Sequence, residues 1–281
     1  MAKRKLEGPE DFERALRNGF GLGQGSNYIP WLRVQDISST GRSTKLPGIL
    51  VDRQHHLLSD HEKRLFLLEE FNVENIDIRE QFPLLPLSLA MRIAEQAGIK
   101  YPIHQKTKKP IIESTDFLLT RKTSEGIKHI AVAVKTSDEL MKVRVLEKLE
   151  IERIWWTLLG VEWRLATEEQ LNRTVCNNLD WFSDPLRGRK RDEINAYLQG
   201  RILNQIQDAL TPGRVKYEKL IEIARRITGC SSSVGSKLVR VMMWRRLIDV
   251  DLYIPIQKEQ IVDITRINAI DLREVNNGIA S

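Results

Sequence analysis

The alternation of apolar and polar positions predicts a mixed α/β arrangement in the first part of the chain. Helical spacing of apolar residues, opened by the N-cap residue Ser59 or closed by Gly160, predicts helices over residues 59–72 and 138–159. Alternation with a period of two predicts strands, and these cover residues 76–86, 111–120, 127–135 and 161–165. The polar stretch between the second and third of these strands is typical of an antiparallel hairpin.

The pattern changes after residue 166, where helical spacing prevails. We expect helices over 192–210, 216–228 and 234–247, followed by short strands over 249–256 and 261–264. Three helices and a two-stranded wing in this order are typical of a winged-helix domain. The sequence therefore predicts two domains, 1–166 and 167–281, with the basic segment 187–193 as a linker. The glycine-containing residues 1–27 are interpreted as a flexible lead-in.

Length and composition agree with two soluble domains. The 281 residues are 41% hydrophobic and 29% charged, as in ordinary globular proteins. No apolar stretch approaches the roughly 18 residues of a membrane span, so we expect no membrane contact. The two cysteines, Cys176 and Cys230, are too isolated to indicate a zinc site or a disulfide framework, which favours the cytoplasm. The net charge of +6 favours a polyanionic partner without identifying it.

Three charged residues form a candidate site for phosphodiester hydrolysis. That reaction needs metal-activated water and a cation that takes up the charge developing on the phosphate. Asp116 lies in one strand of the predicted hairpin, Lys135 ends the other, and Glu62 lies on the preceding helix. Two carboxylates can hold Mg²⁺ while the lysine orients water or neutralises the phosphate. This is the logic of the PD-(D/E)xK nucleases.

Each of these residues also has a purely structural interpretation. Glu62 follows Ser59 by three residues, so the two can form a capping box. Asp116 can begin a turn, and Lys135 can protect the edge of a sheet against pairing. The hairpin pattern alone is too permissive to decide between these interpretations and a nuclease site.

The N-terminal half resembles the TnsA endonucleases of heteromeric cut-and-paste transposases over much of its length and in the same order. The segments that carry the resemblance are GSNYIPWLRVQDISSTGRS at 25–43, HHLLSDHE at 55–62, IDIREQFPLLP at 76–86, STDF at 114–117, AVK at 133–135 and LEKLEIER at 146–153. The C-terminal half resembles the family only in its helical, winged-helix-like layout.

The resemblance implies a fold and an activity. The fold is α/β, with a restriction-endonuclease-like mixed-sheet nuclease domain before the mainly helical winged-helix domain. The activity is Mg²⁺-dependent cutting of the 5′ strands of transposon-end DNA, with Mn²⁺ able to substitute. The implied partners are a TnsB-like DDE transposase and a TnsC-like regulatory ATPase, in the bacterial cytoplasm at DNA. The family's catalytic residues fall on Glu62, Asp116 and Lys135, and Glu152 is either an outer acid of the site or a solvated helix charge.

Ala133 departs from the family pattern, which has Gln, or Glu in most relatives of the fold, two residues before the lysine. Spacing of two along a strand puts Ala133 on the face of Lys135, where its side chain cannot coordinate a metal. Three explanations remain open. A backbone carbonyl of Ala133 or Val134 with water completes the shell, the natural enzyme is weak, or the sequence was altered to block cleavage.

Positive charge gathers in the C-terminal half. Residues 214–246 hold nine Lys and Arg but two Glu. The segment resembles a helix-turn-helix, with phosphate contacts as the expected source of salt-dependent affinity. Contact with DNA and contact with a partner protein are equally compatible with these charges. The candidate residues are Lys216, Lys237, Arg240, Arg245 and Arg246.

Two rival functions remain open at this point. The first is an assembly subunit that keeps the nuclease fold but is catalytically weak or inactive, as Ala133 suggests. The second is a winged-helix transcription regulator, which would bind an operator tightly without partners or metal.

Overall fold

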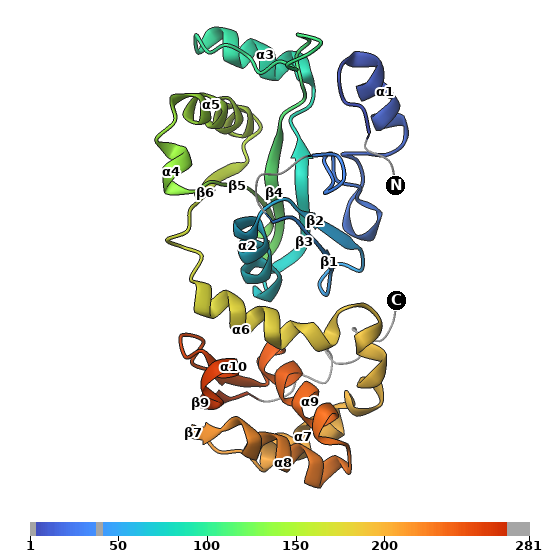
Figure 1. Ribbon diagram of the computed structural model, residues 1–281, viewed down its shortest axis with the longest axis vertical. Coiled ribbons are helices and arrows are strands. Elements are labelled where there is room, and N and C mark those ends of the chain that lie inside the picture. Colours follow the sequence, from blue (N-terminus) through green and yellow to red (C-terminus); the bar gives the residue numbers. More distant parts are fainter. Residues whose placement is uncertain (1–3, 38–41, 269–281) are drawn as a thin grey trace. The chain divides into compact units, whose positions relative to one another are not determined.

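The computed structural model describes residues 4–37 and 42–268 (Figure 1). The chain divides into two compact units, Met1–Leu171 and Asn172–Ser281, each described here by itself. The domain boundary predicted after residue 166 stays a prediction. Among the described residues, no helix is both long and apolar enough to cross a membrane.

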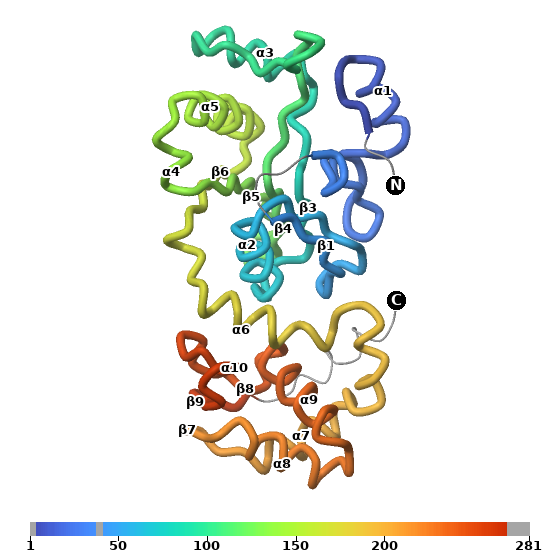
Figure 2. The backbone as a smooth tube through the Cα atoms, in the orientation of Figure 1, coloured from blue at the N-terminus to red at the C-terminus, as the bar shows by residue number. Residues whose placement is uncertain are grey.

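A four-stranded mixed sheet forms the centre of the first unit. Its strand order is β3-β4-β5-β6, with β6 parallel to β5 and the other pairs antiparallel. A parallel pair needs a crossover connection, and α4 (Ser137–Leu140) with α5 (Val143–Leu158) supplies it, as the tube in Figure 2 shows. The strands are β3 (Asn75–Pro83), β4 (Ser114–Thr123), β5 (Gly126–Val134) and β6 (Glu162–Ala166).

Helices cover both faces of this sheet. Successive residues of a strand point to opposite faces, and Leu118 and Leu119 of β4 accordingly belong to two different cores. Leu119 packs in the core beneath α2 (Asp60–Phe71). Leu118 packs in the core formed with α3 (Leu87–Gln96) and α5. The sheet is thus covered by an apolar core on each face.

Residues 4–27 form a defined structure, which corrects the expectation of a flexible lead-in for this part, while residues 1–3 of that expectation lie outside the described residues. Helix α1 (Pro9–Arg17) packs Phe12 against the buried Trp31, with ring centroids 6.0 Å apart. The Arg4 guanidinium donates to Asp36 Oδ2, and the Arg4 backbone amide donates to Asp36 Oδ1. The remaining elements before the sheet are η1 (Gly25–Asn27), β1 (Thr44–Pro47) and β2 (Gln54–Leu57), the last two forming an antiparallel pair.

The predicted elements of the sheet and its first helix are present. The predicted hairpin is formed by β4 and β5. Strand β4 starts three residues later than expected, and residues 111–113 lie in the loop before it. The helix expected over 138–159 is two helices, α4 and α5, since Lys142 has an extended backbone between them. Helix α3 and the β1–β2 pair were not predicted.

The second unit is mainly helical with a three-stranded antiparallel sheet of order β7-β9-β8. The helices expected over 216–228 and 234–247 correspond to α8 and α9. Its helices are α6 (Arg173–Ser183), η2 (Asp184–Leu186), η3 (Gly188–Glu193), η4 (Asn195–Tyr197), α7 (Gly200–Asp208), α8 (Tyr217–Thr228), α9 (Ser232–Trp244) and α10 (Ile256–Glu259). Its strands are β7 (Gly213–Lys216), β8 (Ile248–Val250) and β9 (Ile261–Ile267).

Three expectations for this unit were wrong. The segment 187–193 does not link the two units, because it forms η3 inside the second and begins at the buried Arg187. The helix expected over 192–210 begins only at Gly200. The strand expected over 249–256 ends at Val250, since the buried amide of Asn178 donates to the carbonyls of Leu252 and Ile254 and holds that segment as a turn.

Candidate active site

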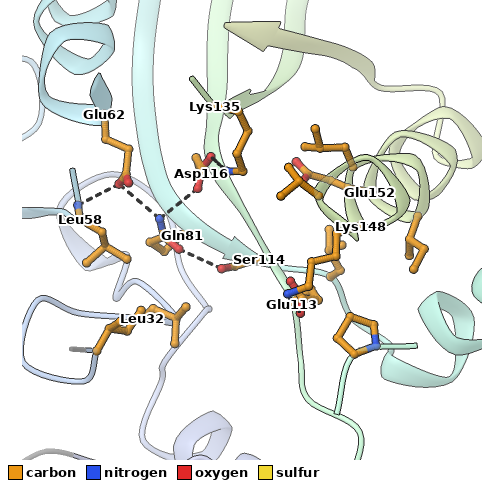
Figure 3. Close-up of a pocket in the computed structure, with 16 residues that line it drawn as sticks. Leu32, Leu58, Glu62, Gln81, Glu113, Ser114, Asp116, Lys135, Lys148 and Glu152 are labelled. Carbon is orange, nitrogen blue, oxygen red and sulfur yellow. Dashed lines mark hydrogen bonds and ion pairs between the residues drawn. The ribbon is translucent and has the colours of Figure 1, made fainter. Parts of the chain in front are cut away.

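A pocket of about 330 Å³ lies at one end of the first unit's sheet (Figure 3). It receives side chains from α2, β3, β4, α5 and the residue that follows β5, so it gathers segments far apart in the sequence. We call it the acidic pocket. Its polar lining residues are Glu62, Gln81, Glu113, Ser114, Asp116, Lys135, Lys148 and Glu152.

Glu62 combines a capping role with a place in this pocket. The Ser59 hydroxyl accepts a hydrogen bond from the Glu62 amide at 3.1 Å, the contact expected of an N-cap residue. The Glu62 carboxylate turns back and accepts bonds from the Leu58 amide at 2.9 Å and the Ser59 hydroxyl at 3.1 Å. The capping contacts therefore hold the buried carboxylate in one orientation at the pocket wall.

Asp116 and Lys135 meet across the β4–β5 hairpin. Lys135 Nζ lies 3.0 Å from Asp116 Oδ2 and also donates to the Val134 carbonyl at 2.8 Å. The same Asp116 oxygen accepts the Val134 amide at 2.7 Å. Asp116 is thus fixed by two donors on one oxygen, and its other oxygen is directed to the interior of the pocket.

Glu152 is a buried member of the site and not a solvated helix charge. Its carboxylate accepts a hydrogen bond from Trp163 Nε1 at 3.1 Å, and Thr115 also bonds to it. Trp156 Nε1 donates to that Thr115 hydroxyl at 2.6 Å, so a buried polar chain runs from α5 to β4. Sequence periodicity alone could not separate the two alternatives, because α5 is buried on more than one side.

Burial and the shared negative charge shift the proton affinities of this group of residues. Burial, with a contribution from Asp116, raises the pKa of Glu62 and that of Glu152 to about 8 each. Burial would lower the pKa of Lys135, but the Asp116 and Glu152 carboxylates outweigh it and raise that pKa. Lys135 therefore does not compensate Glu62, Asp116 and Glu152 together, and this part of the pocket favours a further positive charge.

Comparison with known proteins gives the family. Residues 73–168 match the family model described as TnsA-like endonuclease N terminal. The chain is 39% identical over 189 residues to the Transposon Tn7 transposition protein TnsA of Escherichia coli.

The chain belongs to the TnsA-like family. The match to the Escherichia coli protein covers 67% of this chain and 66% of that protein's length. The matched family model includes Gln81, Asp116, Lys135 and Glu152, whereas Glu62 precedes it.

Ala133 of this TnsA-like chain is completely buried. It lies in β5 opposite Leu165 of β6, and its methyl group provides no ligand. The Val134 carbonyl, one of the backbone groups considered as a substitute, accepts the Lys135 ammonium. A polar side chain for this part of the site must come from another element.

Gln81 is a pocket residue that sequence reasoning missed. It lies inside the IREQFPLLP segment that carried the family resemblance, yet nothing in the alternation of that segment marks it. Its side chain is buried and hydrogen-bonded within the pocket. What distinguishes Gln81 is its backbone conformation, with a φ of +51°, which the sequence pattern does not reveal.

The basic residues of the second unit have different surroundings. Arg240 is buried, donates to the Trp181 carbonyl at 3.2 Å and lies 3.8 Å from Asp184, so it does not project from α9 toward a groove. Lys237 is paired with Glu193. Burial lowers the pKa of Arg245. Lys216, by contrast, is exposed.

Lys216 is part of a shallow hollow at β7 and the start of α8, which Arg214 and Lys219 also line. Arg246 is exposed where α9 ends, with a positive φ of 53°. Lys216 and Arg246 therefore lie at the ends of β7 and α9 and not along α9.

Proposed function

We propose that this TnsA-like chain is a metal-dependent DNA endonuclease that cuts the 5′ strands at transposon ends. The observation that carries the proposal is the convergence of Glu62, Asp116 and Lys135 on one pocket. Three elements far apart in the sequence supply them, which a capping or edge-protecting role for each residue alone does not require. The first unit, with its buried mixed sheet, is proposed to be a restriction-endonuclease-like domain.

The donor set suits Mg²⁺, with Mn²⁺ able to substitute. Mg²⁺ in proteins is commonly held by one or two carboxylates and several waters, and Glu62 and Asp116 would provide the carboxylates. Among the described residues, no group of three or more His, Cys, Asp or Glu is arranged to hold a metal, so other oxygen ligands must contribute. Bound here, the ion would supply Lewis acidity and lower the pKa of water.

Lys135 has a separate role in this proposal. Its ammonium group lies 3.0 Å from Asp116 and remains charged at neutral pH, since its pKa is raised. From that position it would orient the attacking water or neutralise charge that develops on the scissile phosphate. Glu152, behind Asp116 and Lys135, would keep both in place.

A strand-specific cleavage assay tests the proposal. The full chain would be incubated with labelled transposon-end DNA, the partner transposase and Mg²⁺. We expect Asp116→Ala to abolish 5′-strand cuts while partner assembly persists, and Asp138→Ala, which changes an exposed acid on α4, to leave both intact. Unchanged cleavage by Asp116→Ala would mean that the catalytic site lies elsewhere.

The partners are proposed from the family. The relative's printed name describes a transposition protein, which supports action with a TnsB-like DDE transposase and a TnsC-like regulatory ATPase at DNA in the bacterial cytoplasm. We further propose that the second unit is a winged-helix domain for assembly and DNA contact. The order α7, β7, α8, α9, β8, β9 and the exposed Lys216 support this.

Ala133 favours a second candidate function, a catalytically weak or inactive assembly subunit. The two candidates differ in the response to Ala133→Gln, made after a melting curve has shown that the variant folds. Cleavage by the unmodified chain supports the endonuclease. Absence of 5′ cuts in both the unmodified chain and the variant supports the assembly subunit.

A further inference from the structure

Gln81 occupies the space between the two acids that are proposed to hold the cation (Figure 3). Its Nε2 lies 3.4 Å from Glu62 Oε2 and 3.4 Å from Asp116 Oδ1. Its Oε1 accepts a hydrogen bond from the Ser114 hydroxyl at 2.9 Å. Both contacts to the acids are long for hydrogen bonds. The amide therefore lies between the carboxylates without binding either of them tightly.

The backbone of β3 is distorted in a way that brings this side chain to the pocket. A φ of +51° is uncommon for a residue with a Cβ, and such conformations are strained and cluster at functional sites. Ile78 packs beneath α2, whereas Phe82, four residues later, packs against Trp156 of α5. Regular alternation would put residues 78 and 82 on one face, so β3 changes face at Gln81.

The surrounding structure holds this conformation. The Gln81 carbonyl accepts the Trp31 amide at 3.1 Å. The buried Tyr28 hydroxyl donates to the carbonyl of Glu80 at 3.0 Å, and the Gln81 carbonyl lies 3.4 Å from it. The N-terminal segment therefore fixes the distorted part of β3 and, with it, the direction of the Gln81 amide.

The other polar side chains of the pocket are engaged elsewhere. Glu113 is paired with Lys148 at 3.1 Å. Glu152 accepts hydrogen bonds from Trp163 and Thr115. Ala133 provides no ligand. Gln81 is the neutral oxygen-bearing side chain that already contacts both Glu62 and Asp116.

We infer that Gln81 is a third protein ligand of the proposed divalent-cation site and replaces the side-chain ligand that Ala133 lacks. In this structure its NH₂ group faces the two carboxylates. Rotation of the amide by half a turn would present Oε1 to a hard cation, for which amide oxygens are suitable ligands. The nitrogen would then donate to the Ser114 hydroxyl, which can accept as well as donate. This inference rests on the proposed metal-dependent function.

Equilibrium Mn²⁺ binding to the full chain without DNA, followed by electron paramagnetic resonance of free and bound Mn²⁺, tests the inference. Gln81→Gly removes the amide and suits the positive φ, so we expect binding to weaken by about tenfold or more without loss of thermal stability. Gln81→Glu supplies a charged ligand and is expected to bind at least as tightly as the unmodified chain. Gln260→Gly is the matched control, since Gln260 is exposed and also has a positive φ, of 54°.

The outcomes separate the inference from the proposed function. If Asp116→Asn abolishes Mn²⁺ binding and Gln81→Gly binds as the unmodified chain does, the Gln81 ligand is overturned and the site stands. If the unmodified chain binds no Mn²⁺, or if Asp116→Asn leaves binding unchanged, both the metal site and the ligand are overturned. Selective weakening in Gln81→Gly, with Gln260→Gly unaffected, supports the inference.

Discussion

The buried acids make the metal-free protein sensitive to alkali, and a change from pH 6.5 to pH 8 should expose this. Burial and the Asp116 charge raise the pKa of Glu62 and of Glu152 to about 8 in the folded chain. In the unfolded chain both carboxyls would titrate near 4.5. The folded state therefore binds protons that the unfolded state has released. Its free energy of unfolding must fall as pH rises through this range.

The size of the effect follows from the proton linkage. Between pH 6.5 and pH 8, a carboxyl with a pKa of about 8 goes from almost fully to half protonated. Integration of that difference gives a loss on the order of 3 kcal/mol for the two carboxyls together. Burial lowers the pKa of His56 from 6.5 to about 4, so between these pH values the unfolded chain binds a proton that the folded chain does not, and stability rises with pH. The pH interval of the experiment therefore starts at 6.5.

Urea unfolding in the presence of a chelator, at several pH values from 6.5 to 8, measures this loss. We expect Glu62→Gln to remove about half of it, since its neutral amide does not titrate. Glu150→Gln is the matched control, because Glu150 is a partly exposed acid of α5 whose pKa is lowered, and it should leave the pH dependence unchanged. Constant or rising stability of the unmodified chain over this interval would refute the reasoning.

Three further predictions follow from individual contacts. Arg53→Ala removes the guanidinium that binds the buried Glu80, so the free energy of urea unfolding should fall by about 3–5 kcal/mol; Arg53→Lys should lose less. Asn178→Ala leaves two carbonyls of the 251–255 turn unbonded, so calorimetry should show a loss of about 1–3 kcal/mol. Arg240→Ala should lower thermal stability, whereas Lys216→Ala should lower the salt dependence of DNA binding and leave stability unchanged. Equal DNA-binding defects in these last two variants would contradict that assignment.

The sheet of the first unit was predictable because its strands follow regular alternation. Burial on both faces gives β4 and β5 long apolar runs, and the polar turn between them marks the hairpin. Helix α3 was not predicted, because its short sequence directly follows two prolines and has no side-chain N-cap. In the second unit, the single turn of α10 after Pro255 and the Asn178 contacts depend on residues distant in the sequence, which local patterns do not contain.

The candidate site was predictable only in part. Glu62, Asp116 and Lys135 came from the residue types and from the family resemblance, and the structure brings them to one pocket. Their catalytic roles stay predictions. Gln81 was not predicted, because the direction of its side chain depends on a positive backbone φ. Trp31 and Tyr28, from another part of the chain, stabilise that conformation. Arg240 was misjudged because the ring and carbonyl of Trp181 cover it, an arrangement that the spacing of α9 does not reveal.

Glu80 of β3 and Glu62 of α2 are both buried, but their pKa values shift in opposite directions. Glu80 is fully buried, yet the guanidinium of Arg53 and the ring of His55 bind its carboxylate and hold its pKa well below the ordinary value despite burial. Glu62 is similarly buried but has only neutral donors and one shared lysine near it, and its pKa is raised. Glu80 is thus compensated by the protein itself and ties β2 to β3. The negative charge of Glu62 is not compensated in the same way, and Asp116 and Gln81 lie beside it. This arrangement is the one expected of a site that binds a cation.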